Sequence, residues 1–525
     1  MNQRDGLATS TAVAASGVTA GPASQSPQPG AVDQGGRSRA AQPVPVPPAG
    51  EYVLQAGWGV TTPAGFQAGG LHCGIKRRKA DLGWIVAEAP CAAAAVYTRN
   101  RVHAPCLDVT RDGLAATGGY LQAVVCNSGN ANVCTPRAAA DAVEIQALAA
   151  AILGLQPELV AVAQTGVIGE PMPMAAVRQG LAALPRVTSP AGGHAFAEAI
   201  LTTDTRTKEW GALCHLPGAE EDHGVPHAAL SSPPVEPAPP GPPRPGGPSV
   251  LPAPAGLVAR PGEPAPLEPV ANAAGAGGPG GPAGGSPARR GRFVRIGGAA
   301  KGSGMIHPQM ATMLAFITTD AAIEPAALQA WLREVTERTF NAISVDGDTS
   351  TNDMVIVLAS GRAGGPPLAP GRPGWETWAA AAEAVCDRLA REIAADGEGA
   401  TRLITVEVEG APDDAAARQV ARTVVASPLV KTAVHGADAN WGRVLAAAGR
   451  SGVDLDPSRV DVDLGAIPVC RGGLGVPFDE GAAAAYLRSP EVVIRLKVGD
   501  GPGRGRAYGC DLSPGYVHIN ASYRT

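Results

Sequence analysis

A long low-complexity segment divides this chain and limits what the remainder can fold into. From His215 to Gly291, proline and glycine approach half of all residues, in runs such as GAGGPGGPAGGSP that have no collagen-like period. Residues 1–49 are also poor in large apolar side chains, so burial cannot offset the entropy cost of ordering them. We therefore expect a disordered N-terminal extension and a linker-like insertion. They leave about 400 residues for two folded blocks, roughly 50–214 and 292–525.

The first block alternates strand-like and helix-like patterns. Two short apolar runs, 121–126 and 159–164, stop at clusters of turn-forming residues, which is typical of buried strands that lead into loops. Between them, 138–153 is rich in alanine and is followed by Gly154 as a stop signal. We expect a helix there, with apolar residues at helical intervals: Val143, Leu148 and Ile152.

The second block repeats this alternation. Pro325 can open a helix at its first turn, and a further helix is expected over 375–395. Residues 402–409 and 492–498 alternate apolar with polar side chains, which is the period of a half-buried strand. Because strands and helices interleave in both blocks, the sequence predicts an α/β or α+β class with sheets covered by helices.

The charge pattern limits the partners of the chain. A formal net charge of -5 argues against a nucleic-acid partner, since phosphate binding needs basic patches. We expect the basic run 76–79 to be an exposed turn and the arginines between 289 and 295 to be solvated linker. No apolar run reaches the length of about 18 residues that a membrane helix needs, so no membrane partner is expected.

The cysteines indicate a reducing compartment. There are 9 of them, an odd number, with no C-x-x-C pair and no Cys/His zinc spacing. Neither a disulfide framework nor a metal site is therefore expected, and the cytoplasm fits best. Residues 1–49 carry several arginines and many Ser and Thr but few acidic residues, so the mitochondrial matrix is the less favoured location.

The segment 301–320, KGSGMIHPQMATMLAFITTD, contains an Ala311–Thr312 bond whose cleavage would create a nucleophile. A threonine within a chain is a poor nucleophile. If this bond is cut, the new amine of Thr312, with a pKa of about 7.7 to 8.0, can take the proton from its own hydroxyl. A structural interpretation competes, because four apolar residues have helical spacing and predict a core-facing helix: Met310, Met313, Leu314 and Ile317. Both interpretations hold if an apolar helix anchors the new terminus.

Two glycine-rich or acidic segments fail the tests for common binding motifs. In GGAAKGSG, 297–304, the lysine precedes the Gly-Ser pair, so the order that a phosphate loop requires is absent. In DGDTSTND, 346–353, Thr351 stands where the sharp turn of a calcium loop needs glycine. We expect the second segment to be a polar turn that supports an active site.

Thr165 and Gly166 follow a predicted strand directly. Such a pair is usually a plain turn. Beside a nucleophile it gains a role, because a hydroxyl and a glycine N–H without a neighbouring Cβ can donate to a developing oxyanion.

Segments along the whole ordered chain resemble those of one family. KGSGMIHPQMATML, which begins at Lys301, resembles the self-cleavage segment of the ArgJ family, the ornithine acetyltransferases (glutamate N-acetyltransferases) of arginine biosynthesis. Gln309 and Arg402 depart from the family pattern, where Asn and Lys are expected. Further matching segments are GFQAGGLHCGIKRRKADLGWIV, CNSGNANVCT, ILTTDTRTKE, DGDTSTND, DGEGATR, SPLVKTAVHGADANWGRVLAAAG and INASYRT.

The resemblance implies roles for particular residues. The precursor would be cut between Ala311 and Thr312, Thr312 would become the nucleophile, and Thr165 with Gly166 would form the oxyanion hole. The residues implied to contact the substrate are Thr202, Lys301, Thr312, Glu398, Asn520 and Thr525.

The resemblance also implies a fold and a reaction. The fold is a layered α/β arrangement with helices covering mixed β-sheets. It is built from a self-cleaved precursor whose α chain spans 50–311, with the insertion, and whose β chain spans 312–525. Two copies of each chain would form a heterotetramer. Acetyl would pass from N2-acetylornithine to glutamate through acetyl-Thr312, without a cofactor, and acetyl-CoA could be a second acetyl donor. For such amino-acid ligands, Lys301 suits the carboxylate and Glu398 the ammonium.

Two other functions stay open. An N-terminal-nucleophile amidohydrolase or aminopeptidase would pass the acyl group to water instead of glutamate. A non-catalytic binding protein would use the Pro/Gly-rich insertion to recruit partners.

Overall fold

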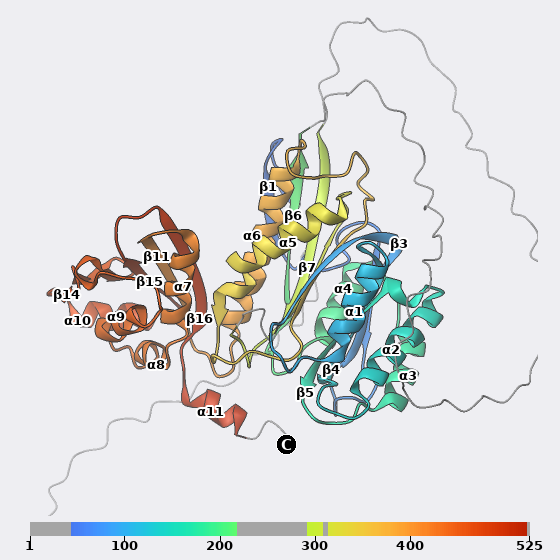
Figure 1. Cartoon of the computed structure of the whole chain (residues 1–525), viewed down its shortest axis with the longest axis horizontal. Coiled ribbons are helices and arrows are strands. Elements are labelled where there is room, and N and C mark those ends of the chain that lie inside the picture. Colours follow the sequence, from blue (N-terminus) through green and yellow to red (C-terminus); the bar gives the residue numbers. More distant parts are fainter. Residues whose placement is uncertain (1–43, 218–290, 308–312, 522–525) are drawn as a thin grey trace, which may run out of the picture. The chain divides into compact units, whose positions relative to one another are not determined.

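The computed structural model describes residues 44–217, 291–307 and 313–521. Their strands form two mixed sheets, and helices interleave with the strands along the chain (Figure 1). The predicted α/β class with sheets covered by helices is confirmed. All of the elements named below belong to one unit by their contacts, Pro45–Thr525.

The first sheet joins segments from both sides of the predicted cut. Its 9 strands run in the order β1-β6-β7-β8-β10-β3-β4-β5, with β2 also paired to β3. The pairs β8–β10 and β4–β5 are parallel, and the other pairs are antiparallel. The strands are β1 (Tyr52–Ala56), β2 (Phe66–Leu71), β3 (Leu82–Tyr97), β4 (Tyr120–Asn130), β5 (Val160–Val167), β6 (Lys208–Leu216), β7 (Arg292–Lys301), β8 (Leu314–Thr319) and β10 (Met354–Ala359).

The expectation of a helix through the Met and Leu residues after Thr312 is wrong, because Leu314–Thr319 is the strand β8. Every residue of β8 is buried. Leu314 and Phe316 face one core, while Ala315 and Ile317 face another. A central strand that is covered on both faces is apolar at nearly every position, so a chance helical spacing can be found within it.

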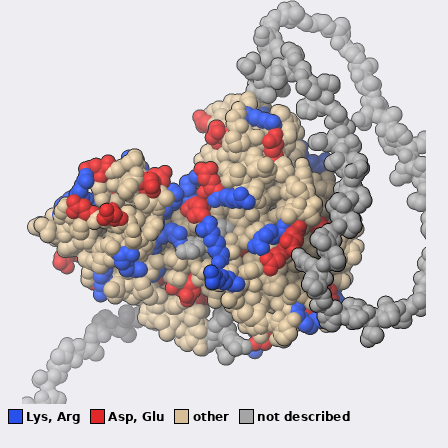
Figure 2. Space-filling model, in the orientation of Figure 1, with Lys and Arg blue, Asp and Glu red and all other residues tan. Residues whose placement is uncertain are grey.

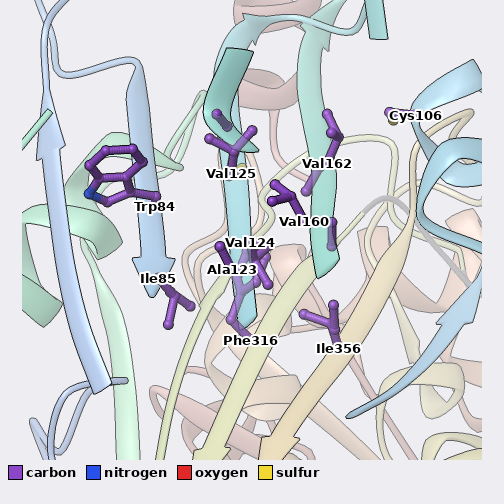
Figure 3. Packing of buried hydrophobic residues seen from close by; sticks show 14 of the residues in the cluster. Trp84, Ile85, Cys106, Ala123, Val124, Val125, Val160, Val162, Phe316 and Ile356 are labelled. Atoms are coloured by element: carbon purple, nitrogen blue, oxygen red, sulfur yellow. The ribbon is translucent and has the colours of Figure 1, made fainter. Parts of the chain in front are cut away.

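Helices cover both faces of this sheet. The first core is formed with α1 (Pro105–Ala116), α2 (Ala138–Leu153), α3 (Met174–Ala183) and α4 (Pro190–Ala199), and the second with α5 (Pro325–Arg338) and α6 (Trp375–Ala395). Side chains of β4, β5, β8 and β10 meet in the first core, as the positions of Val124, Val160, Phe316 and Ile356 show (Figure 3). The helices predicted from Pro325 and over 375–395 are confirmed.

The helix predicted over 138–153 is confirmed, and of its three apolar residues at helical intervals only Leu148 packs against the core. Gly154 ends α2 with a φ of 70°, as a stop residue should. Val143 and Ile152 are 54% and 42% exposed, whereas Ala142, Ile145 and Ala149 are buried among others. Alanine occupies so many positions of α2 that the few larger side chains carry little information about which face packs closely.

The second sheet has 7 strands in the order β14-β13-β12-β15-β11-β16-β9. The alternation predicted over 402–409 is confirmed, since Ile404, Val406 and Val408 of β11 are buried. The strands are β9 (Ile343–Ser344), β11 (Leu403–Ala411), β12 (Asp461–Leu464), β13 (Ile467–Arg471), β14 (Leu474–Gly475), β15 (Glu491–Lys497) and β16 (Gly503–Cys510). The helices that follow β11 are α7 (Asp414–Val425), α8 (Pro428–Gly436), α9 (Trp441–Gly449), α10 (Glu480–Leu487) and α11 (Pro514–Asn520). Short 3-10 helices lie at Pro157–Leu159, Phe340–Ala342 and Pro457–Arg459.

The strands on either side of the Pro/Gly-rich segment are direct neighbours. β6 and β7 pair antiparallel from Lys208 opposite Ala300 to Leu216 opposite Arg292. Residues 218–290, like residues 1–43, lie outside the described part of the chain. The insertion therefore joins the two ends of a hairpin.

The expectation that the arginines between 289 and 295 belong to a solvated linker is wrong for two of them. Arg292 and Arg295 are not linker, because both belong to β7, and Arg295 lies 3.6 Å from Asp320. On the face that Figure 2 displays, acidic and basic side chains are interspersed. Among the described helices, none has the length and apolar character needed to cross a bilayer.

Candidate active site

One cavity collects six residues that the sequence analysis singled out. They come from the end of β5, the loop after α4, the end of β7, the loop after α6 and the helix α11. These six are Thr165, Gly166, Thr202, Lys301, Glu398 and Asn520. The other lining residues are Ala131, Ile168, Thr203, Gly304, Met305, Ser350, Thr351 and Asn352. Ala311, Thr312 and Thr525 lie outside the described residues, as does Gln309.

Thr165 and Gly166 are held by the pairing of β5 with β4. Opposite them, residues 128–129 of β4 continue the strand where a turn was expected, so both predicted strands extend further than the sequence indicated. Gly166 has a φ of 134°. A Cβ there would stand 2.2 Å from the carbonyl carbon of Gly129. Only glycine therefore permits this close approach.

Side-chain amides replace the turn that was expected at the end of β4. Gln164 donates to Asn127 Oδ1 at 2.8 Å, and Asn127 donates to the carbonyl of Asn130 at 2.8 Å. Asn352, from the polar segment 346–353, donates to the carbonyls of Ala131 at 2.8 Å and Gln164 at 3.0 Å. These buried bonds satisfy backbone groups that a strand end leaves free. The position of Thr165 is thereby fixed from both neighbouring segments.

Lys301 is a buried cation at the end of β7. Its side chain is almost fully covered, and Nζ donates to the hydroxyl of Thr165 at 3.5 Å. Burial lowers the pKa of Lys301, while the carboxylate of Asp204 opposes that shift. A partly desolvated ammonium beside a cavity is suited to a carboxylate ligand. The glycine-rich run before Lys301 belongs to the strand β7, so it does not form a phosphate loop.

Glu398 and Asn520 line the same cavity and come from the part of the chain after the predicted cut. Asn520 Nδ2 donates to Glu398 Oε2 at 2.7 Å. The backbone N–H of Glu398 donates to the carbonyl of Ser303 at 2.9 Å. A Cβ on Gly304 would lie 2.2 Å from Glu398 Oε2, so glycine is required for the carboxylate to sit here. A buried carboxylate with free lone pairs is a suitable acceptor for a ligand ammonium.

Several polar residues near the cavity were not predicted. Lys76, expected in an exposed turn, instead donates from Nζ to the carbonyl of Leu201 at 2.7 Å, beside Thr202. Burial lowers the pKa of Lys76 to about 8. Asp204 and Lys208 are buried behind Thr202. Both residues lie in the matching segment ILTTDTRTKE, where they form an acid–base pair at a spacing of four residues.

Asp353 is a buried acid at the end of the polar segment 346–353. It is 2% exposed, and its carboxyl oxygens make no well-formed hydrogen bond to the described residues, although Met313, Thr98 and Ser350 lie close enough to oppose part of the shift in its pKa. Burial raises the pKa of Asp353 well above the ordinary value. It shares a small cavity with Met313, the residue after Thr312.

Another acid of the same segment accepts hydrogen bonds from the backbone. Asp346 accepts from the N–H groups of Met305 at 2.5 Å and Ile306 at 2.9 Å. The described residues contain no group of three or more His, Cys, Asp and Glu that could hold a metal ion.

Comparisons with known proteins point to one family. The ArgJ family model matches residues 67–223 and 286–525. The arginine biosynthesis bifunctional protein ArgJ of Symbiobacterium thermophilum is 46% identical over 471 residues, which is 89% of this chain and 98% of that protein. The protein of the same name from Bacillus subtilis is 41% identical over 476 residues, 90% of this chain and 98% of that protein.

Solved structures of similar sequence were also found. The arginine biosynthesis bifunctional protein of Bacillus halodurans is 49% identical, covers 40% of this chain and 100% of the solved chain, and has a TM-score of 0.40. The ornithine acetyltransferase of Mycobacterium tuberculosis, solved in complex with ornithine, is 36% identical. It covers 31% of this chain and 88% of the solved chain, with a TM-score of 0.30.

Proposed function

The chain belongs to the ArgJ family, whose members are acetyltransferases of arginine biosynthesis, and we propose that it moves acetyl from N2-acetylornithine to glutamate through Thr312. One observation supports this most strongly. Thr165, Gly166, Lys301 and Glu398 line one cavity, although they come from segments on both sides of the Ala311–Thr312 bond.

The first step is self-cleavage. The hydroxyl of Thr312 attacks the carbonyl carbon of Ala311, the C–N bond breaks, and the amide nitrogen takes a proton to become the amine of Thr312. Water then hydrolyses the resulting ester, which releases the carboxylate of Ala311 and restores the hydroxyl. The product is an N-terminal threonine whose own amine can act as a base.

The α and β chains produced by this cut stay associated. β8 and β10, which follow the cut, pair with β7 and β3, which precede it. The backbone ladder and the two cores would have to separate for the chains to part.

The acetyl transfer is a double displacement. Thr312 attacks the acetyl carbonyl of N2-acetylornithine, ornithine leaves after its nitrogen is protonated, and acetyl-Thr312 remains. Glutamate then attacks this ester through its amine, and the Thr312 amine accepts the proton. In each step Thr165 Oγ and the Gly166 N–H donate to the oxyanion, and one such donor is typically worth about 2.7 to 4 kcal/mol.

The cavity walls supply contacts for an amino-acid ligand. Lys301 pairs with the substrate carboxylate and Glu398 with its ammonium, while Asn520 and Thr202 donate or accept at the polar edges. Thr525 is assigned to the same ligand by family resemblance alone. No cofactor takes part, and acetyl-CoA is proposed as an alternative acetyl donor.

The assembly and location follow the family. We place two α and two β chains in a heterotetramer, in the cytoplasm. Mass measurement of the native assembly checks the first statement, since an assembly other than two copies of each chain would contradict it.

Cleavage and transfer can be tested together. Intact-mass analysis of the purified protein should show two chains that meet at Ala311–Thr312, and the protein should transfer acetyl from N2-acetylornithine to glutamate with ping-pong kinetics. The variant Thr312→Ala should lose both activities, and Thr312→Ser, which keeps a hydroxyl, should retain cutting. A single uncut chain without transfer activity would support a binding protein instead.

The nature of the acceptor separates the two enzymatic functions. Release of free acetate with no acetylglutamate would favour an amidohydrolase or aminopeptidase. Acetyl-CoA offered as the only donor tests the second acetyl source, because acetylglutamate should then form without N2-acetylornithine.

A further inference from the structure

We propose that Lys208 is a positioning residue whose ammonium bridges two buried carboxylates, Asp204 and Asp396, and so fixes the two walls of the substrate cavity relative to each other. This inference rests on the proposed function of the cavity. We name the three residues the buried triad. None of its members lines the cavity itself.

The three side chains of the triad are joined by short hydrogen bonds and are almost completely buried. Lys208 Nζ donates to Asp204 Oδ1 at 2.7 Å and to Asp396 Oδ2 at 2.6 Å. The side chains of Lys208 and Asp204 have no exposed surface, and that of Asp396 is 5% exposed. Burial alone would raise the pKa of Asp204, but the ammonium groups of Lys301 and Lys208 hold it below the ordinary range. The Asp204 carboxyl is therefore held in its charged form in the folded protein.

The Asp204 carboxylate organises one wall of the cavity. Its Oδ2 accepts from the N–H of Thr202 at 3.0 Å. Its Oδ1 accepts from the N–H of Gly302 at 2.7 Å. Gly302 directly follows Lys301, so Asp204 ties the Thr202 loop to the end of β7, where the proposed carboxylate-binding lysine is placed.

Asp396 connects the segment after the proposed cut, which contains Glu398, to residues that precede the cut. Its carboxylate accepts from the N–H of Thr205 at 3.1 Å and from the hydroxyl of the same residue. Its backbone carbonyl accepts from Ser303 Oγ at 2.7 Å. Ser303 in turn accepts, at its own carbonyl, the N–H of Glu398 at 2.9 Å. The position of Glu398 is thus linked to Lys208 through three successive hydrogen bonds.

The arrangement makes the Lys208 ammonium one of the links that set the spacing between Lys301 and Glu398, beside the direct bond from the Glu398 N–H to the Ser303 carbonyl. A ligand that pairs its carboxylate with one and its ammonium with the other depends on that spacing. Displacements of about 1 Å in such a site can cost up to about 10²-fold in rate. A lysine fixes this geometry better than an apolar side chain would, because its ammonium must lie within hydrogen-bond distance of both carboxylates at once.

The variant Lys208→Met removes the charge and keeps the side-chain length. We expect the KM for N2-acetylornithine and for glutamate to rise by about tenfold or more, with a smaller change in kcat. Cutting at Thr312 should persist, because Thr165 and Gly166 are held mainly by the β4–β5 pairing and not by a hydrogen bond from Lys208. The matched control is Arg206→Met. It breaks the exposed Arg206–Glu392 pair, 2.6 Å long, which also joins the two sides of the cut, and it should leave both KM values unchanged.

The double variant Lys208→Met with Asp396→Asn separates positioning from stability. Lys208→Met alone leaves two buried carboxylates near each other, which destabilises the fold. The double variant removes one of these charges, so thermal stability should recover while both KM values stay raised, because the bridge is still absent. Recovery of KM together with stability, or an equal KM effect in Arg206→Met, would overturn the proposal. A wild-type protein that fails to transfer acetyl would refute the proposed function instead.

Discussion

Gly166 shows how strictly a single residue can constrain the site. Its φ of 134° and the approach of Gly129 exclude a Cβ, so Gly166→Ala must displace β5 from β4. We expect Gly166→Ala to reduce kcat by about 10²–10³-fold, because the N–H proposed for the oxyanion hole would move. The matched control is Gly169→Ala, since Gly169 also has a positive φ, 81°, but nothing lies within 4 Å of its Cβ position.

Gly169→Ala should therefore cost about 1–3 kcal/mol of unfolding free energy through backbone strain and leave kcat nearly intact. Urea denaturation and steady-state kinetics on both variants check this contrast. Equal losses of kcat in the two variants would show that strain, not displacement of the oxyanion donor, is responsible.

Because the Asp353 carboxyl is buried, we expect the stability of the protein to depend on pH in a particular direction. The pKa of this carboxyl in the folded state is raised by burial, while the unfolded value is about 3.9. As pH rises above about 4, the unfolded chain releases this proton but the folded chain resists release, so the unfolding free energy falls by up to about 1.4 kcal/mol per pH unit. Asp353→Asn removes this effect. The variant should therefore gain stability relative to the wild type between pH 4 and pH 7, in denaturation curves measured across that interval.

Some residues of the site could be predicted from the sequence and others could not. Thr165, Lys301 and Glu398 could be placed in one site because their motifs match a family, and the structure brings them to one cavity. Lys208 and Asp396 also lie in matching segments, ILTTDTRTKE and DGEGATR, but the resemblance implied no role for either residue. The two residues lie 188 positions apart, and a buried lysine bridging two acids leaves no periodic signal in the sequence.

At the scale of elements, β8 and α2 allow the energetic cost of truncating a buried apolar side chain to be compared with that of an exposed one. Ile317 of β8 is 1% exposed and Val143 of α2 is 54% exposed, although both are large apolar residues at helical intervals in the sequence. Ile317→Ala should cost about 2–5 kcal/mol of unfolding free energy. Val143→Ala, which removes a mostly solvated side chain, should change it by no more than about 0.5 kcal/mol. Similar costs for the two variants, in urea denaturation, would contradict the assignment of β8 as a central strand.

Helices were easier to predict than strand ends. α2, α5 and α6 could be located because alanine or amphipathic spacing extends over many residues between clear start and stop signals. The ends of β4 and β5 could not. Asn127 and Gly129 are typical turn formers, yet here amide bonds and a close backbone contact continue the strand through them. Such tertiary bonds override local propensity, and they occur at the proposed site.

At the scale of the whole molecule, the cut should leave one cooperative unit. The neighbouring strands β8 and β10 come from the β chain and lie between β7 and β3 of the α chain, so one sheet contains strands from both chains. We expect the cut protein to unfold in a single transition, and the two chains to remain together in gel filtration until that transition is reached. Separation of the α and β chains at a lower urea concentration than the loss of helical signal would show that the shared sheet does not hold them.

The Pro/Gly-rich insertion should be dispensable for catalysis. Leu216 and Arg292 face each other at the open end of the β6–β7 hairpin, so a two-residue Asn-Gly turn in place of 218–290 can close it without moving either strand. The cavity is lined by the opposite end of β7, at Lys301, which the shortened turn does not touch. The shortened protein should therefore be cut at Thr312 and transfer acetyl with unchanged kcat and KM. A matched variant that replaces 218–290 with a flexible Gly-Ser linker of equal length separates length from composition. Loss of cutting in both variants would mean that the insertion's own sequence takes part in processing, whereas loss only in the short variant would mean that its length is needed.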